Sequence, residues 1–216
     1  MSLSDRRRER LSEVLDQRLS SLVVVVEAVR RRHNTSAILR SAEAFGVHEV
    51  HLVTGDFRPS KGAARGAERW LELHRHATTT EALTALKARG FQVWLADPAP
   101  GHLDPMAVPV DRPIAVLFGS ELNGVSDEAR GLADGVLAVP MLGLTESLNV
   151  SAAAAVVIYA LAERRRALVG RSDLEPERRQ AFWQAWLARE LEAEEGLRVT
   201  AGEDALEDPG WFEPED

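Results

Sequence analysis

The chain has 216 residues, 45% of them hydrophobic, so it can bury one sizeable core but leaves little room for a second full domain. It contains no cysteine, which excludes disulfides, thiolate zinc sites and cysteine nucleophiles together. No apolar stretch reaches the roughly 20 residues of a membrane span, and no signal-peptide pattern opens the sequence. These features lead us to expect a cytoplasmic protein with no membrane partner.

The formal net charge of -8 is unevenly distributed along the chain. Residues 1–40 hold nine arginines against five acidic residues, whereas residues 171–216 hold five arginines against fourteen acidic residues. An acidic total therefore does not exclude a nucleic-acid partner, because a local arginine cluster can still bind phosphate groups.

Taken in chain order, the sequence alternates between strand-like and helix-like segments. A charged amphipathic helix is predicted at residues 4–19, with Leu11, Leu15 and Leu19 on one face. Short apolar or β-branched runs then predict buried strands, and the segments between them predict helices with N-caps at Asn34, Thr79 and Ser126. The predicted strands are 22–26, 49–53, 91–95, 114–118 and 135–139, and the predicted helices are 34–45, 80–89, 126–133 and 148–166.

This alternation predicts an α/β domain with a mostly parallel sheet and helices on both faces. We assign residues 22–170 to that domain, residues 1–21 to an N-terminal helical extension, and residues 171–216 to a C-terminal helix with an acidic tail. The C-terminal helix is expected at residues 174–194, where Trp183 and Trp186 have the spacing of a packed helix face. The last twenty residues, rich in acidic residues, proline and glycine, are expected to be mobile.

Ligands of open parallel sheets bind beyond the carboxyl ends of the strands, so candidate functional residues are expected in the loops that follow strands. The first such loop, residues 30–40, has three arginines and a histidine leading into a helix that Asn34 can cap. Arg40 lies six residues further on, and its side chain can lean back toward the same helix end. A phosphate site and a plain capped helix with solvated arginines explain this pattern equally well.

The second loop, residues 118–124, places Glu121 between Gly119 and Gly124 directly after a strand. Glycines permit close approach of a ligand to the backbone, but on its own this pattern is better explained as an ordinary turn. The sequence has no G-x-G-x-x-G, P-loop or G-x-S-x-G motif, which removes support for dinucleotide enzymes, P-loop NTPases and α/β-hydrolases.

The third loop, residues 139–151, runs into a helix that is predicted to begin near Ser147 or Leu148. Ser147, Asn149 and Ser151 crowd more polar side chains around this helix start than one cap requires. Ordinary capping before a buried helix still explains most of the pattern.

Histidines are paired at His48 and His51 and again at His74 and His76. His74 and His76 would share one face of a strand, but no third ligand lies nearby in the sequence, so no metal site is predicted.

Together and in this order, the three loops resemble the signature motifs of the SpoU family, the ribose methyltransferases of the SPOUT superfamily. The first motif is an asparagine followed six positions later by an arginine, here Asn34 and Arg40. The second is an apolar strand followed by G-x-E-x-x-G, here residues 119–124. The third is a proline and a methionine followed by S-L-N-V-S, here residues 140–141 and 147–151. The resemblance covers residues 22–166.

The resemblance implies an S-adenosylmethionine-dependent enzyme that methylates a ribose 2′-hydroxyl in RNA, with a deep trefoil knot in the C-terminal part of the domain. It also implies a homodimer whose active site is shared, with Arg40 reaching the methyl donor from the neighbouring subunit. The residues implied to bind the cofactor, through their backbone groups, are Ala96, Gly119, Val139, Met141 and Leu148.

In this interpretation Arg40 stabilises the developing alkoxide, and a phosphate or water takes the proton, because a guanidinium is too basic to accept it. The other residues implied to act in catalysis hold the ribose, the arginine and the loop in place; they are Asn34, Glu121, Ser147 and Asn149. The residues expected to contact RNA are Arg6, Arg7, Arg8, Arg10, Arg30, Arg31, His33, Arg164, Arg165 and Arg166.

The short extensions at both ends resemble those of family members that methylate guanosine 18 in the D-loop of tRNA. Ribosomal RNA or another tRNA position is the alternative substrate. A protein of another class, which keeps the fold only to bind RNA or a protein partner, is the alternative function; the presence of Asn34, Arg40, Glu121, Ser147 and Asn149 argues against it.

Overall fold

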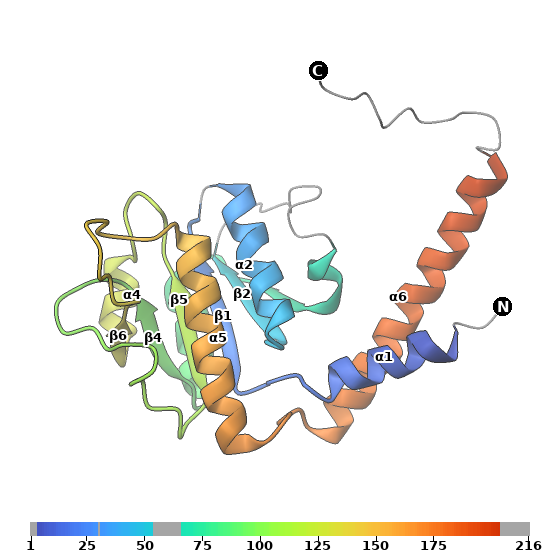
Figure 1. Cartoon of the computed structure of the whole chain (residues 1–216), viewed down its shortest axis with the longest axis horizontal. Helices are drawn as coiled ribbons and strands as arrows, with labels where there is room; N and C mark the ends of the chain where they lie inside the picture. The colour runs from blue at the N-terminus through green and yellow to red at the C-terminus, as the bar shows by residue number, and fades with distance from the viewer. Residues whose placement is uncertain (1–3, 30, 54–65, 204–216) are drawn as a thin grey trace. The chain divides into compact units, whose positions relative to one another are not determined.

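A computed structural model describes residues 4–29, 31–53 and 66–203 of the chain, with side chains described up to residue 192. Its centre is a six-stranded parallel sheet in the order β3-β2-β1-β5-β4-β6 (Figure 1). The strands are β1 (Leu22–Glu27), β2 (Glu49–Val53), β3 (Glu72–Arg75), β4 (Gln92–Ala96), β5 (Ile114–Phe118) and β6 (Gly135–Leu137). The predicted parallel α/β sheet is confirmed.

The strand β3 is absent from the predicted strand ranges. It lies at the edge of the sheet, and its sequence ELHR carries charged or ionisable residues at three of four positions. Such an edge strand is only partly buried, so it lacks the continuous apolar run that identified the other strands. The last strand ends at Leu137, two residues before its predicted end.

The helices are α1 (Asp5–Leu15), α2 (Arg32–Ala44), α3 (Thr79–Ala88), α4 (Asp127–Leu132), α5 (Val150–Val169) and α6 (Pro176–Glu203), with a short 3-10 helix at Ala67–Trp70. Ser126 caps α4 as predicted, accepting the backbone N–H of Ala129 at 3.1 Å. The cap of α3 is Thr78 rather than Thr79, and α5 begins at Val150 with Asn149 as its cap.

The prediction that Asn34 caps α2 is wrong. That helix begins at Arg32 after Arg31, which makes no side-chain cap, so Asn34 lies inside the first turn. The Asn34 side chain is buried, with 1% of its surface exposed, and its polar atoms bond to other loops.

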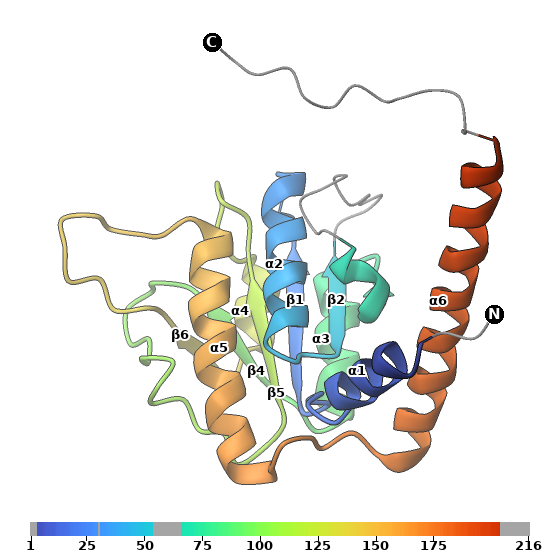
Figure 2. The same cartoon turned by 45° about the vertical axis from the view of Figure 1, so that its right-hand side comes forward.

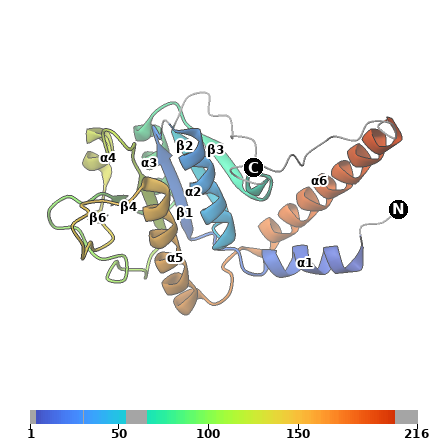
Figure 3. The same ribbon diagram turned by 45° about the horizontal axis from the view of Figure 1, so that its top comes forward.

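Helices cover both faces of the sheet, as predicted. Helices α2 and α5 lie side by side over one face, where Ile38 and Val157 share a core with Val24 of β1 (Figure 2). On the opposite face α3 and α4 pack over Val23 and its neighbours, which form a second core with Leu83 (Figure 3). Successive residues of a strand point to opposite faces, so a strand buried on both sides needs an unbroken apolar run such as Val23 to Val26.

A buried carboxylate joins the end of β1 to the starts of α3 and α4. Glu27 accepts the hydroxyl of Thr79, and its two oxygens accept the backbone N–H of Ser126 at 2.9 Å and the Ser126 hydroxyl at 2.6 Å. This contact was not foreseen from the sequence, because a carboxylate at the end of an apolar strand is usually solvated.

Among the described residues, 4–15 and 175–203 form one compact unit, and residues 16–174 form a second one. Within the terminal unit α1 and α6 are in contact: Arg7 donates two hydrogen bonds to Glu190, at 2.6 and 3.0 Å, and Arg179 donates to Ser12 at 2.8 Å. Residues 16–21 and 171–174, assigned above to the extensions, belong to the α/β unit. Helix α6 continues nine residues beyond its expected end at residue 194, and the acidic tail from residue 204 lies outside the described residues.

No helix among the described residues is long and apolar enough to cross a membrane. The trefoil knot remains a prediction, because strand order alone does not define how a chain threads through itself.

Candidate active site

The order of the strands brings the loops after β1 and β5 together at the centre of the sheet. From β1 the chain continues to β2 on one side, and from β5 it continues to β6 on the other side. The loops that leave these neighbouring strands therefore diverge at their carboxyl ends, which is where parallel sheets bind ligands.

A pocket of about 460 Å³ opens at this position, within the volume range of small-molecule sites. Its wall contains all five residues implied to bind the cofactor: Ala96, Gly119, Val139, Met141 and Leu148. They come from the end of β4, from the loop after β5 and from the loop that joins β6 to α5. The structure thus brings together residues that lie as much as 52 positions apart in the chain.

A chain of side-chain hydrogen bonds joins the three motifs beside this pocket. Asn34 donates from Nδ2 to Glu121 Oε1 at 2.5 Å, and its Oδ1 accepts from Nδ2 of Asn149 at 3.3 Å. Asn149 in turn accepts the backbone N–H and the hydroxyl of Ser151 at 2.8 and 2.6 Å, so the start of α5 is held by the same chain. The crowding of polar residues before α5 therefore does more than cap a helix.

The two glycines of the second motif are required by the shape of the loop that carries Glu121. Ser120 and Gly124 exchange two backbone hydrogen bonds at 2.9 and 3.0 Å, which folds the loop tightly back on itself. A Cβ on Gly119 would collide with the Gly124 carbonyl, and Gly124 has a φ of +65°, which L side chains rarely adopt. The glycines thus fix where Glu121 meets Asn34.

Ser147 lines the pocket with Glu121 and Asn149, whereas Arg40 does not. Arg40 is exposed on α2 and makes no hydrogen bond or ion pair with any residue that the structure describes. Within one chain, four members of the implied catalytic set lie in the pocket wall or in the hydrogen-bond chain beside it: Asn34, Glu121, Ser147 and Asn149. The fifth member, Arg40, lies in neither.

Some pocket residues were not foreseen. Asp97 directly follows β4, and Glu146 lies in the loop before α5; both line the pocket. The rule that selected the other loops, polar residues after a strand, applies equally to Asp97 and would have found it.

Three arginines that are expected to bind RNA make hydrogen bonds within the α/β unit. Arg165 is 6% exposed and donates to the Ser21 hydroxyl at 2.7 Å and to the Val110 carbonyl at 2.5 Å. Arg164 donates to the carbonyls of Pro105 and Val108, and Arg166 donates to those of Gln17 and Phe45. Arg165 therefore faces inward, which composition alone cannot show, and phosphate contacts by the three arginines stay a prediction.

The remaining RNA candidates differ in their surroundings. Arg31 lies in the pocket wall, and His33, two residues further along the chain, is exposed. In the terminal unit Arg7 is paired with Glu190 and Arg10 with Glu13, while Arg6 and Arg8 are exposed. Arg30 lies outside the described residues.

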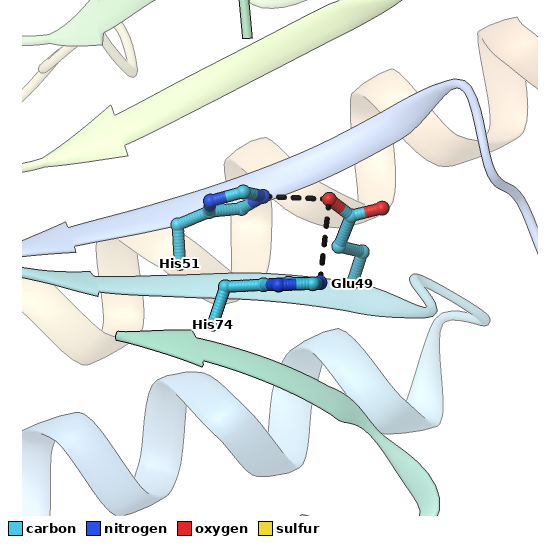
Figure 4. Close-up of side chains that lie close together, drawn as sticks. All are labelled: Glu49, His51 and His74. Atoms are coloured by element: carbon cyan, nitrogen blue, oxygen red, sulfur yellow. Dashed lines mark hydrogen bonds and ion pairs between the residues drawn. The ribbon is translucent and has the colours of Figure 1, made fainter. Parts of the chain in front are cut away.

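A second cluster of ionisable side chains lies away from the pocket, on the α3 face of β2 and β3 (Figure 4). Glu49 and His51 come from β2, His74 comes from β3, and their nearest ligand atoms lie within 4.8 Å of one another. No third ligand for His74 lies nearby in the sequence, and the pairing of β2 with β3 is what places Glu49 and His51 close to it.

The cluster in this form is a hydrogen-bond network and not a converged set of metal ligands. His51 and His74 stack with ring centroids 4.8 Å apart and planes 20° from parallel, so their in-plane lone pairs do not point at one common position. Glu49 is also occupied by Arg89, whose Nη2 lies 2.9 Å from Oε2. Burial alone would raise the pKa of Glu49, but the hydrogen bonds from Arg89 and His51 outweigh it and hold that pKa well below its usual range.

Comparison with known proteins decides which family carries this site. The model of the SpoU rRNA Methylase family matches residues 21–159, a range that contains all three motifs. The chain belongs to the SpoU rRNA Methylase family.

Members of the SpoU family are similar to this chain over most of its length. A tRNA (guanosine(18)-2′-O)-methyltransferase of Thermus thermophilus is 42% identical over 191 residues, which are 86% of this chain and 98% of the relative. The crystal structure of the Aquifex aeolicus TrmH/SpoU tRNA modifying enzyme is 30% identical, with a TM-score of 0.78 over 86% of this chain and 97% of that one. The SpoU methyltransferase AviRb of Streptomyces viridochromogenes, solved in complex with the cofactor AdoMet, is 25% identical, with a TM-score of 0.60 over 70% of this chain and 62% of that one.

Proposed function

We propose that this chain is an S-adenosylmethionine-dependent methyltransferase that methylates the ribose 2′-hydroxyl of guanosine 18 in tRNA. The observation that carries the proposal is the hydrogen-bond chain of Glu121, Asn34 and Asn149 at the edge of a pocket walled by all five expected cofactor residues. The similarity to the Thermus thermophilus enzyme, which spans nearly all of that relative, supports the choice of nucleotide.

The residues present fit the cofactor. The pocket volume suits a ligand of this size, and its wall joins an apolar part, including Val139, Leu148 and Val157, to polar groups at Glu121 and Asn149. When bound there, S-adenosylmethionine supplies a methyl group activated by a positive sulfonium. The chain's own task is to hold the acceptor ribose beside that group: Ser147 and Asn149 line the pocket, and Asn34 holds Glu121 and Asn149 in place.

We assign to Arg40 the role of stabilising the negative charge that develops on the ribose oxygen. A guanidinium has five N–H donors and no acceptor, so it stabilises an alkoxide but does not remove its proton, which passes to an RNA phosphate or to water. We expect Arg40→Ala to keep the affinity for the cofactor and to lower the rate of methyl transfer by at least about a hundredfold. Near-normal turnover by this variant, measured with radiolabelled cofactor, would contradict the assignment.

We infer that Arg40 acts in a homodimer, reaching the pocket of the other subunit. In one chain it lies outside the pocket, and the loop before α5 exposes Leu142 and Leu144 almost completely. Helix α5 also exposes Val156 and Tyr159. Large exposed apolar side chains of this kind are typical of a surface that a second subunit covers.

A separate experiment tests which RNA and which nucleotide the enzyme methylates. The purified chain is incubated with labelled S-adenosylmethionine and either a tRNA transcript with G18 or the same transcript with nucleotide 18 changed to another base, and a ribosomal RNA fragment serves as the alternative substrate. We expect labelling of the G18 transcript alone, and a tRNA substrate fits the cytoplasmic location that we propose for the enzyme. Equal labelling of the changed transcript would exclude the D-loop assignment and favour another tRNA position.

A non-catalytic role in binding RNA or a protein partner predicts a different result. Calorimetry with S-adenosylmethionine separates the two functions, since a purely structural protein has no reason to bind the cofactor. We expect saturable binding with one site per chain.

A further inference from the structure

Asp97 is a mostly buried carboxylate in the wall of the cofactor pocket that none of the three family motifs includes. It is the first residue after β4, directly beyond Ala96, and its backbone N–H donates to the Leu137 carbonyl at 2.9 Å. This bond fixes its position between the ends of β4 and β6. Only 13% of the side chain is exposed, so the carboxylate is held within the wall and is not a solvated surface group.

The carboxylate of Asp97 has an ionic partner but retains hydrogen-bonding capacity. Its Oδ2 forms an ion pair with Arg130 of α4. This contact uses Oδ2, whereas Oδ1 accepts no hydrogen bond from any residue that the structure describes. A mostly buried carboxylate that lines a pocket and uses only one oxygen within the chain keeps the other oxygen to accept a hydrogen bond from a ligand.

The ion pair determines which kind of donor suits Asp97. S-adenosylmethionine presents two positive groups, the sulfonium and the ammonium, and two neutral donors, the hydroxyls of its ribose. A carboxylate whose charge is already balanced by Arg130 attracts a further cation weakly, but its lone pairs still accept from neutral hydroxyls. Glu146, which also lines the pocket and is paired with no described residue, is the better match for a cation.

We propose that Asp97 binds the ribose hydroxyls of S-adenosylmethionine, adding a side-chain contact to a cofactor site otherwise made by backbone groups. This inference rests on the cofactor of the proposed function. Because a hydrogen bond to a charged acceptor strengthens binding substantially, Asp97→Ala should weaken cofactor binding about 10- to 100-fold.

The experiment measures binding by calorimetry, without turnover, using S-adenosylhomocysteine and its 2′,3′-dideoxy analogue. Wild-type protein should bind the first ligand about 10- to 100-fold more tightly than the second, whereas Asp97→Ala should bind both with nearly equal, weak affinity. Asp97→Asn, which keeps one acceptor oxygen, should fall between. A loss of affinity in Asp97→Ala that is the same for both ligands would overturn the assignment to the ribose hydroxyls.

Two control variants separate this role from a structural one. Asp111→Ala removes an exposed aspartate of the same unit and should leave both affinities unchanged. Arg130→Ala removes the ion pair but leaves the acceptor, so it should keep the preference for the ligand that carries hydroxyls; loss of that preference would show that Asp97 acts only through Arg130. Failure of the wild-type chain to bind S-adenosylhomocysteine would instead overturn the cofactor assignment itself.

Discussion

At the scale of single residues, Asn34 shows why the site needs an amide at this position. Its side chain donates to the Glu121 carboxylate and accepts from the Asn149 amide, two tasks that neither a carboxylate nor a hydroxyl performs in the same geometry. The sequence predicts Asn34 both as a helix cap and as a residue of the first SpoU motif. The structure rejects the cap, because the helix begins two residues earlier.

We expect Asn34→Asp to lower methyl transfer more than Asn34→Ala. The aspartate removes the donor and sets a second negative charge against Glu121, whereas alanine only removes the bonds. The expected losses are at least about a hundredfold for Asn34→Asp and about tenfold for Asn34→Ala, measured as kcat/KM with tRNA. Ser41→Ala, which changes a half-buried hydroxyl on the same helix, should retain activity. Wild-type turnover by Asn34→Asp would contradict the role of the hydrogen-bond chain.

At the scale of elements, strand pairing creates interactions that neighbouring residues in the sequence do not make. His51 lies 2.7 Å from Glu49 through Nε2 and 2.8 Å from His76 through Nδ1. With Glu49 ionised, His51 carries its proton on Nε2, so Nδ1 accepts from His76. Burial lowers the pKa of His51, opposed by its hydrogen bond to Glu49 and reinforced by the nearby His74 and His76.

This lowered pKa predicts that stability falls in mild acid. Below the unfolded-state pKa of about 6.5, the unfolded chain binds a proton that folded His51 resists, so the free energy of unfolding decreases as the pH falls. One such group gives a slope of at most about 1.4 kcal/mol per pH unit, which begins near the unfolded-state pKa and ends at the lower pKa of the folded chain. Denaturant unfolding of His51→Gln should show a smaller slope, and His102→Gln, an exposed histidine, should show the wild-type slope. An unchanged slope in His51→Gln would exclude His51 as the source.

Glu27 links β1 to the starts of α3 and α4, and its replacement tests how much these hydrogen bonds contribute to the free energy of unfolding. In Glu27→Gln one carboxylate oxygen becomes an NH₂ group, which cannot accept from Thr79 or Ser126. A buried donor left without its acceptor costs about 1–3 kcal/mol, so the free energy of unfolding should fall by that amount. Glu128→Gln, at an exposed position on α4, should unfold at the wild-type denaturant concentration. Equal stability of the two variants would argue that the junction is not stabilising.

At the scale of the whole molecule, the position of Arg40 raises the question of whether a complete active site requires two subunits. Arg40→Ala and Asn149→Ala chains, co-expressed with different tags, give a heterodimer that carries one defect in each chain. If the site is shared, one of the two sites in that heterodimer is intact, and it should show about half of the wild-type activity. If Arg40 serves its own chain, both sites are defective and no activity should return; the two homodimers serve as controls.

Much of the fold and part of the site could be predicted from the sequence. The apolar runs of β1 and β5 and the order of the motifs identified the parallel sheet, the pocket wall and the polar set around Asn34. The same reasoning gave no range for β3, whose residues are mixed because it lies at an edge, and it did not show that Arg165 faces inward. It also missed Asp97, although the rule for loops after strands applied to it.

The sequence by itself determined the periodicity of each element and the residues that carry chemistry, because both depend on local spacing along the chain. Only the tertiary structure decided which loops meet: the pairing of β1 with β5 brings Asn34 to Glu121 across 87 positions of sequence, and the pairing of β2 with β3 places His74 against Glu49. The physical reason is that a pattern of side chains along one segment indicates which residues are buried, but not which residues of other segments they contact. Those contacts are fixed by strand order and packing, which no single segment encodes.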